Sequence, residues 1–222
     1  MDDQGKDRGF VISDVDGTLT SVLSVWEYLH RRLDRWDGDG DRNLADYLDG
    51  RIDYPEFARR DALAYQNLSR SRLQQLTMEI PRRRGLDTML KYFQRLNWPV
   101  ALVSSGLDIL VDQIPGASIR VANRLCFLND ICTGEVLIDV PMDGKARIVA
   151  SLLNSYRLDR RCVIAIGDSR GDIPMMAAAG FAIAVAPLHA EVADAADAVI
   201  TGEDLSEICD LVGDYRKKAG LV

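Results

Sequence analysis

Short apolar runs without polar alternation restrict the possible folds of this sequence more than any other feature. They recur between amphipathic stretches and read GFVISD, WPVALVSS, RCVIAIGD, GFAIAVAP and DAVIT. Strands that carry apolar residues on both sides are typical of a sheet that is covered on both faces. Helical patterns separate these runs, as in KARIVASLLNSY, DIPMMAAAG and EDLSEICDLV. The alternation of strands and helices predicts an α/β fold with a parallel sheet.

Two segments depart from this alternation. In RVANRLCFLNDICTGEVLID, two β-rich runs flank Asn129 and Asp130, which predicts a hairpin. Residues 21–94 contain helical patterns and no convincing buried strand, so we expect an inserted helical cap there. Residues 1–20 and 95–222 would then form the core domain.

Composition and charge exclude several classes of protein. A chain of 222 residues with 47% hydrophobic content can bury a core, and it is long enough for one domain with an insertion or for two small domains. A net charge of −7 argues against nucleic acid or an anionic membrane as the main partner, and the segment Arg82–Arg84 reads as a solvated helix flank. The four cysteines form no CxxC motif and have no nearby histidine pair, which argues against zinc and redox sites.

Targeting signals are not recognisable either. The first ten residues, MDDQGKDRGF, contain no apolar signal core. No apolar run approaches the roughly 18 residues that a membrane span needs. The sequence therefore predicts a cytoplasmic protein.

Aspartates follow two of the predicted strands. Asp14 and Asp16 end the first run, where alternation would place both side chains on one face, and Asp168 and Asp172 follow RCVIAIGD. Each aspartate alone is equally suited to a turn or a helix N-cap. Because ligands bind beyond the carboxyl ends of parallel strands, we expect all four to converge. Four carboxylates require a cation, and an all-oxygen set suits Mg²⁺.

Phosphate-binding groups are expected at two further strand ends. Ser104 and Ser105 lie in LVSSG, before a helix that is expected near Leu107, where hydroxyl and backbone N–H groups would face an anion. A serine N-cap is an equally good interpretation of that stretch. Lys145 in MDGKARIV lies in the first turn of a helix, where the helix dipole disfavours a cation unless it pairs with an anion.

The order DVDGT, SSG, GK and GDSRGD resembles the haloacid dehalogenase superfamily of Mg²⁺-dependent phosphohydrolases. The resemblance spans nearly the whole chain, and the helical insertion resembles the cap of that superfamily. The stretches ANRL, GDSRGDIPMMAAAG and AVAPLHAEVADAADAVI are similar to the phosphoserine phosphatase branch.

The resemblance implies a role for each motif residue. Asp14 would attack phosphorus and form an aspartyl-phosphate, and Asp16 would act as the general acid and then as the general base. Mg²⁺ would be held by Asp14, Asp168 and the carbonyl oxygen of Asp16, with Asp172 in its inner or outer sphere. Phosphoryl oxygens would be held by Ser104, Ser105 and Lys145, with Thr18 beside them in the turn that it shapes with Gly17.

The substrate is less well indicated by the resemblance. Leu23 occupies the position of the acidic residue that receives the substrate amine in phosphoserine phosphatases. The carboxylate-binding arginine of those enzymes corresponds to Asp61, so Glu27, Arg59 or Arg60 would have to substitute. Arg170 is an unusual charge within GDSRGD. A small phosphomonoester is therefore predicted, with phosphoserine as the leading candidate.

Other classes of function remain open. A phosphotransferase or mutase would hand the same aspartyl-phosphate to an alcohol instead of water. A phospho-accepting signalling module is the less favoured alternative, because it has no use for Asp16 or for a cap. The expected partner is a small phosphorylated metabolite, and the expected state is a monomer or homodimer. Hinges of a moving cap are expected near Thr20–Leu23 and Pro81–Gly85.

Overall fold

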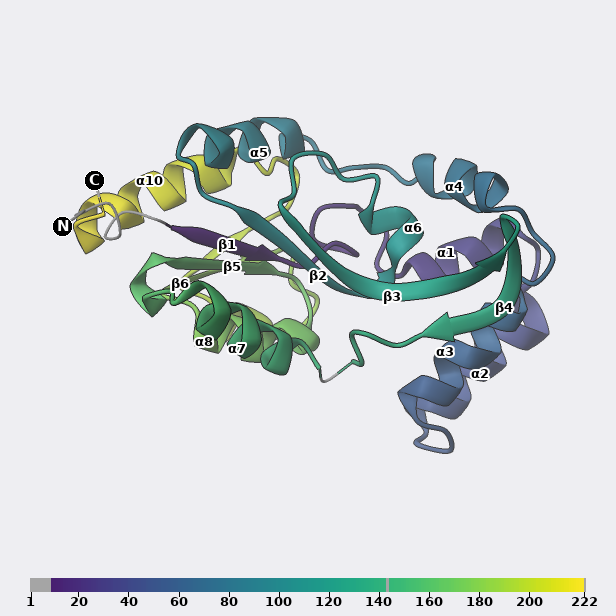
Figure 1. The fold of residues 1–222 in the computed structure, drawn as a ribbon. Coiled ribbons are helices and arrows are strands. Elements are labelled where there is room, and N and C mark those ends of the chain that lie inside the picture. Colours follow the sequence, from purple (N-terminus) through teal and green to yellow (C-terminus); the bar gives the residue numbers. More distant parts are fainter. Residues whose placement is uncertain (1–8, 143, 222) are drawn as a thin grey trace.

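The structure is a computed structural model that describes residues 9–142 and 144–221. Residues 1–8, which the sequence assigns to the core, and Asp143 of MDGKARIV lie outside the described residues. A seven-stranded sheet with the order β4-β3-β2-β1-β5-β6-β7 runs through the molecule, and β1 (Phe10–Ser13) lies at its centre (Figure 1). None of the helices within the described ranges is long and apolar enough to cross a membrane.

The strands coincide with the predicted apolar runs. Every neighbouring pair is parallel except β3 and β4, so the predicted α/β fold with a parallel sheet is confirmed. Asn129 and Asp130 join β3 to β4 with φ values of 49° and 61°, as a tight hairpin turn requires. The remaining strands are β2 (Val100–Leu107), β3 (Ile119–Leu128), β4 (Ile131–Leu137), β5 (Val163–Gly167), β6 (Phe181–Val185) and β7 (Ala198–Ile200).

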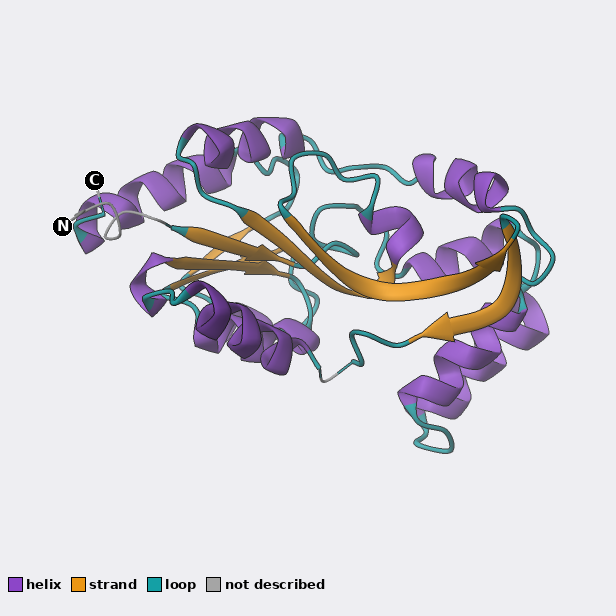
Figure 2. Ribbon diagram, viewed as in Figure 1, coloured by secondary structure: helices purple, strands orange, loops and turns teal. Residues whose placement is uncertain are grey.

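Helices cover both faces of the sheet, which explains why its central strands lack polar alternation. Phe10 and Ile12 of β1 pack into the core on one face, and Val11 packs into the core on the other. Figure 2 shows α5 and α10 on one side of the sheet and α7 and α8 on the other. These helices are α5 (Leu86–Arg95), α7 (Lys145–Tyr156), α8 (Ile173–Ala178) and α10 (Glu207–Ala219); α6 (Asp108–Val111) and α9 (Ala190–Asp194) are short.

Four helices of the insertion gather beside the far end of the β3–β4 hairpin (Figure 1). They are α1 (Val25–Arg32), α2 (Asp41–Leu48), α3 (Tyr54–Leu63) and α4 (Arg70–Met78). Ser24, Asp53 and Ser69 start three of them, because each side chain accepts the backbone N–H three residues later, at 3.3, 2.9 and 3.1 Å. The helix α5, at the end of the insertion, lies instead beside α10.

Backbone hydrogen bonds join the insertion to the hairpin. The N–H of Asn67 donates to the Cys132 carbonyl at 2.9 Å, and the N–H of Cys132 donates to the Leu68 carbonyl at 2.8 Å. The N–H of Arg70 donates to the Asp130 carbonyl, also at 2.8 Å. The hairpin is therefore a platform for the helices of the insertion.

The two connections between the insertion and the sheet run side by side. The N–H of Ser21 donates to the Pro81 carbonyl at 3.1 Å, and the N–H of Arg83 donates to the Leu19 carbonyl at 3.0 Å. The Arg83 guanidinium also donates to the Gly17 carbonyl, at 2.7 Å from one nitrogen, and to the Gly202 carbonyl at 2.9 Å. The interpretation of Arg82–Arg84 as a solvated flank of a helix fits Arg82 and Arg84, which are exposed just before α5. It does not fit Arg83, which is half-buried and joins three parts of the chain.

Candidate active site

Three buried carboxylates meet where the chain order of the sheet reverses. Asp14 follows β1 and Asp168 follows the neighbouring strand β5, while β2 and β6 lie on opposite sides of this pair. Asp172 ends the turn Arg170–Asp172 that leads into α8. One oxygen from each of Asp14, Asp168 and Asp172 lies within 4.8 Å of the others. Such a reversal is where ligands bind in open α/β sheets, and the predicted convergence of these three residues is confirmed.

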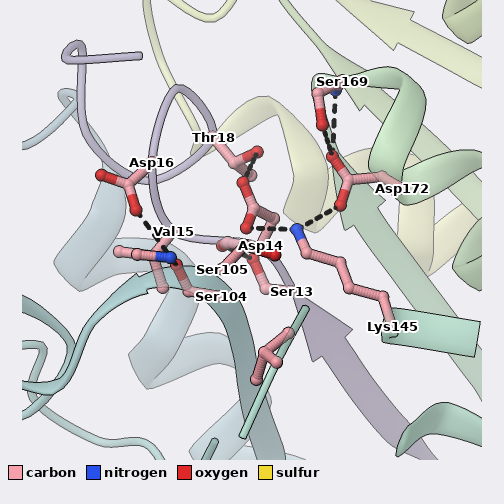
Figure 3. Close-up of polar contacts among 12 residues, drawn as sticks. Ser13, Asp14, Val15, Asp16, Thr18, Ser104, Ser105, Lys145, Ser169 and Asp172 are labelled. Carbon is pink, nitrogen blue, oxygen red and sulfur yellow. Dashed lines mark hydrogen bonds and ion pairs between the residues drawn. The ribbon is translucent and has the colours of Figure 1, made fainter. Parts of the chain in front are cut away.

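Lys145 provides the only ammonium that the structure shows among these carboxylates (Figure 3). It is the first residue of α7, and its Nζ lies 2.6 Å from Asp14 Oδ1 and 2.6 Å from Asp172 Oδ1. Burial lowers the pKa of Lys145, but the two carboxylates raise it by more. The net pKa lies above the ordinary value, so the side chain stays protonated. This double pairing explains a cation in a position that the helix dipole disfavours.

Asp172 is held by the chain that surrounds it. Its Oδ2 accepts hydrogen bonds from the backbone N–H of Asp168 at 3.1 Å, and from the N–H and hydroxyl of Ser169 at 2.9 and 2.8 Å. A Cβ at Gly167 would lie 2.5 Å from the Asp172 Cβ, so only glycine fits there. Both carboxylate oxygens of Asp172 therefore already have protein partners.

Thr18 contacts the same cluster through its hydroxyl. Thr18 Oγ1 lies 2.7 Å from Asp168 Oδ1 and 3.3 Å from Asp14 Oδ2. The turn depends on Gly17, whose φ is 77° and whose missing Cβ would lie 2.3 Å from Asp168 Oδ2. Burial raises the pKa of Asp168 to about 6, against the lowering effect of the Thr18 hydrogen bond.

Asp16 is directed away from this cluster. Its Oδ2 accepts a hydrogen bond from Ser104 Oγ at 3.0 Å, and its Oδ1 accepts one from the Val25 N–H at 2.8 Å. The expectation from alternation is therefore wrong, because the chain turns after Val15 and Asp16 faces β2 and α1 (Figure 3). Burial, followed by the charge of Asp14, raises the pKa of Asp16 to about 7.

The two serines of LVSSG differ in their contacts. Ser104 Oγ accepts the Gly106 N–H at 2.8 Å in addition to donating to Asp16, whereas Ser105 Oγ lies 3.5 Å from the Pro141 carbonyl. The strand β2 continues to Leu107, and the helix expected there is only the four-residue α6. The polar groups at this strand end are therefore serine hydroxyls and backbone N–H groups of the strand itself rather than the start of a long helix.

The Ser105 carbonyl accepts hydrogen bonds from three other segments. Trp26 Nε1 lies 3.2 Å away, the Tyr54 hydroxyl 2.5 Å and Asn123 Nδ2 2.8 Å. Trp26 and Tyr54 come from the insertion, whereas Asn123 belongs to β3. Our sequence interpretation did not identify these three residues as part of the site, and the stretch ANRL was the only signal that included one of them.

A cavity of about 230 Å³ separates the insertion from the carboxylates. Its walls on the core side include Asp14, Asp16, Ser104, Ser105, Gly106, Met142, Lys145, Asp168, Ser169 and Gly171. On the side of the insertion they are Leu23, Ser24, Trp26, Leu44, Tyr47, Tyr54 and Phe57. The predicted catalytic and phosphate-binding groups therefore face one cavity, which is partly open to solvent, except for Thr18 and Asp172, which lie behind its lining.

Four residues considered for substrate recognition lie outside this lining. Glu27 pairs with Arg31 at the surface, and Arg59 and Arg60 both pair with Glu56. Asp61 is buried beside His30, whose Nε2 lies 3.3 Å from Asp61 Oδ1. Arg170, the unusual charge in GDSRGD, pairs with Glu191 at the surface and does not face the cavity either.

Comparisons with known proteins agree with this geometry. A family model for haloacid dehalogenase-like hydrolases matches residues 11–177. A phosphoserine phosphatase of Lactococcus lactis is 30% identical over 80% of this chain and 83% of its own length. A phosphoserine phosphatase of Methanocaldococcus jannaschii is 25% identical over 91% of this chain and 97% of its own length.

Solved structures show the same fold. A phospho-aspartyl intermediate analogue of phosphoserine phosphatase matches with a TM-score of 0.77 and 23% identity, and covers 93% of this chain and 99% of that chain. A substrate-bound phosphoserine phosphatase matches with a TM-score of 0.78 and 22% identity over the same shares.

Proposed function

Because this chain belongs to the haloacid dehalogenase-like hydrolases, in their phosphoserine phosphatase-like branch, we propose that it hydrolyses a small phosphomonoester through an aspartyl-phosphate. One observation carries the proposal: Asp14, Asp168, Asp172 and Lys145 meet at the reversal of the sheet, beside a cavity of about 230 Å³. A solved relative in the form of a phospho-aspartyl analogue supports the intermediate.

The first step is the transfer of the phosphoryl group to Asp14. A phosphomonoester repels nucleophiles through its own charge, so positioning and charge neutralisation dominate catalysis. A carboxylate oxygen of Asp14 forms a bond to phosphorus while the bond from phosphorus to the ester oxygen breaks. Asp16 gives its proton to that oxygen, and a pKa of about 7 leaves enough of the protonated acid near neutral pH.

The second step returns the enzyme to its starting state. The Asp16 carboxylate takes a proton from water, whose oxygen forms a bond to phosphorus while the bond to Asp14 breaks. The products are inorganic phosphate, the Asp14 carboxylate and protonated Asp16. The same side chain thus acts as acid and base, and its two hydrogen bonds, from Ser104 and Val25, hold it between the core and the cap.

The carboxylates fit Mg²⁺ as the cofactor. The donor set consists of oxygens only, and the group is buried, as suits a hard divalent cation. By the family resemblance, Asp14, Asp168 and the Asp16 carbonyl would be the direct ligands. Asp172, whose oxygens accept hydrogen bonds from Lys145 and Ser169, would lie in the inner or outer sphere. When bound, Mg²⁺ would offset the repulsion between carboxylate and phosphoryl oxygens.

Ser104, Ser105 and Lys145 would hold the phosphoryl oxygens through hydroxyl, backbone N–H and ammonium groups. The Thr18 hydroxyl faces Asp168, so we assign it the orientation of that carboxylate rather than direct contact with phosphate. We also propose that residues 21 to about 80 form the cap that covers the site. The helix α5 would then belong to the core, because it packs beside α10.

The assay that tests this function measures inorganic phosphate released from phosphomonoesters in the presence of Mg²⁺, with and without an acceptor alcohol. A phosphatase releases phosphate at a rate that is independent of the alcohol, whereas a phosphotransferase or mutase forms a new ester. A phospho-accepting signalling module would show no sustained turnover. Phosphoserine, the substrate in the names of the relatives, is the leading named candidate from similarity.

A further inference from the structure

The wall of the cavity opposite the carboxylates is built from aromatic rings. Tyr47 stacks on Phe57 with ring centroids 5.3 Å apart, and Tyr54 meets Tyr47 edge-on at 5.9 Å. Trp26 meets Phe57 edge-on at 6.4 Å. These separations lie within the range that aromatic pairs favour. The rings therefore support one another, and they form a preorganised apolar surface rather than a loose lining.

The polar ends of two of these residues are already used. Tyr54 donates its hydroxyl hydrogen to the Ser105 carbonyl, and its oxygen accepts a hydrogen bond from Asn123 Nδ2 at 2.9 Å. Trp26 Nε1 donates to the same carbonyl. Burial raises the pKa of Tyr54, so this hydroxyl remains a neutral donor. What these two residues add to the wall is therefore ring surface.

None of the charged side chains described in the cap lines the cavity, and those of α3 are paired with one another or with neighbouring helices. Glu56 accepts hydrogen bonds from Arg59 at 2.8 Å and from Arg60 at 2.7 Å. Asp61 is buried between His30 and Asn43 Nδ2, the latter at 2.9 Å. Among the described residues that line the cavity, the charged ones are Asp14, Asp16, Lys145 and Asp168, to which the proposed reaction already gives roles.

This lining is unsuited to a substrate that carries further charges. The ammonium and carboxylate of phosphoserine would lose water on entering the cavity without gaining a partner of opposite charge from the cap, which is unfavourable for both groups. Apolar surface on the substrate would instead replace water against the rings. The cavity of about 230 Å³ also lies below the roughly 300–1,000 Å³ typical of pockets for drug-sized ligands, so the alcohol is small.

We infer that the natural substrate is a phosphomonoester of a small, uncharged and largely apolar alcohol, whose carbon skeleton lies against Trp26, Tyr47, Tyr54 and Phe57. This inference rests on the proposed phosphatase function and departs from phosphoserine as the candidate. It specifies a class of leaving group: alkyl or benzylic alcohols without an ammonium or a carboxylate.

The first test compares kcat/KM for n-propyl phosphate, benzyl phosphate and phosphoserine. The n-propyl ester keeps the three-carbon skeleton of phosphoserine and lacks both charges, and all three leaving groups are alkyl-type alcohols. We expect the two uncharged esters to exceed phosphoserine by at least about tenfold. A kcat/KM for phosphoserine equal to or above theirs overturns the inference and leaves the phosphatase function standing. No phosphate release from any ester overturns both.

The second test introduces the missing charge at Leu23, which lines the cavity and is 56% exposed. Leu23→Glu should raise the ratio of kcat/KM for phosphoethanolamine, which carries only an ammonium, to that for n-propyl phosphate by about tenfold. A ratio cancels any uniform effect of the new charge on the phosphate. Leu63→Glu is the control, because Leu63 is a cap leucine that is 46% exposed and lies outside the cavity lining.

The control variant should leave the ratio unchanged. If Leu23→Glu also leaves it unchanged, Leu23 does not face the leaving group and the inference is wrong. If the unmodified protein already prefers phosphoethanolamine to n-propyl phosphate, a group in the cavity recognises the ammonium, and the inference is wrong for that reason.

Discussion

The backbone N–H of Val25 lies 2.8 Å from Asp16 Oδ1 and donates a hydrogen bond to it. Val25 is the first residue of α1, so the proposed acid–base group is bound to the cap as well as to Ser104 of the core. Both hydrogen bonds favour the charged form of Asp16, whereas burial favours its neutral form. The effect of burial is the larger, so the pKa of Asp16 is raised to about 7.

Val25→Pro removes this donor and keeps the helix, because proline is tolerated at the first helical position. The residue before it, Ser24, has the extended backbone that a following proline requires. The pKa of Asp16 should rise further, since its charged form loses a hydrogen bond. Asp16 then stays protonated to higher pH, so the alkaline limb of the phosphoryl-transfer step should move to higher pH in rapid-quench measurements. Val25→Ala trims the same side chain and keeps the N–H, so identical pH profiles for the two variants would contradict the prediction.

Metal removal should abolish activity. Buried carboxylates at Asp14, Asp168 and Asp172 need a cation when a charged substrate approaches. Chelator-treated protein should release no phosphate, and added Mg²⁺ should restore the rate. Ca²⁺ should restore it poorly, because its larger and more flexible coordination misplaces the phosphoryl group. Undiminished turnover in excess chelator would rule out the metal site.

The two aspartates of DVDGT should fail in different ways. Asp14→Asn should abolish phosphoryl transfer, because an amide is not a nucleophile here. Asp16→Asn should slow both steps by about 10² to 10⁴, the usual contribution of a general acid or base. Steady-state phosphate release, measured together with the amount of trapped phospho-enzyme, distinguishes the two variants. Asp87→Asn, at the surface, serves as the control. Near-normal turnover by Asp14→Asn would show that the aspartates of DVDGT have a structural role only.

Stability should depend on pH through His30, which is buried beside Asp61. Burial lowers the pKa of His30, but the Asp61 carboxylate raises it more, so the folded value lies above the unfolded value of about 6.5. The contribution of the pair of His30 and Asp61 to the free energy of unfolding is complete below the unfolded pKa of His30. It is lost as pH rises through the folded pKa. Urea unfolding at several pH values should show this decline.

The second histidine of the chain provides the control. His189 is exposed, so His189→Gln should leave the pH dependence of stability intact, whereas Asp61→Asn should remove this part of it. An unchanged slope in Asp61→Asn would disprove the coupling.

Cap movement should be visible at the two paired connections. The amides of Ser21 and Arg83 donate across the connections, so their hydrogen exchange reports opening. Mg²⁺ with a phosphate mimic should slow exchange at both, because closure excludes water. Amides of β1 in the buried sheet should not change and serve as the internal reference. Equal protection with and without the mimic would argue against hinges here.

The sequence was sufficient for the sheet and for the convergence of Asp14, Asp168 and Asp172. A strand such as β1 packs both faces, so its apolar run follows directly from its surroundings, and aspartates at neighbouring strand ends must meet. The position of α5 could not be predicted in this way. An amphipathic helix has the same periodicity whichever body it packs against, so its place beside α10 requires the tertiary structure.

Contacts made by backbone atoms were also beyond the sequence. Trp26, Tyr54 and Asn123 donate to one backbone carbonyl. Every residue has such a carbonyl, so the type of residue at position 105 does not indicate that these donors will meet there. Likewise, Arg83 binds carbonyls of Gly17 and Gly202, and no charge pattern along the chain indicates such partners.

The direction of the Asp16 side chain was predicted wrongly for a local reason. Asp16 points away from Asp14 because the backbone forms a turn there instead of the extended conformation that alternation assumes.

The Ser105 carbonyl belongs to the end of β2 that would hold the phosphoryl group, and it also accepts hydrogen bonds from Trp26 of α1 and Tyr54 of α3 in the cap. Where two binding equilibria are coupled, the coupling is reciprocal. If docking of the cap on this strand end strengthens the binding of phosphate, bound phosphate strengthens docking by the same factor. Loss of inorganic phosphate would then loosen the cap, and opening of the cap would weaken the binding of phosphate to the same extent.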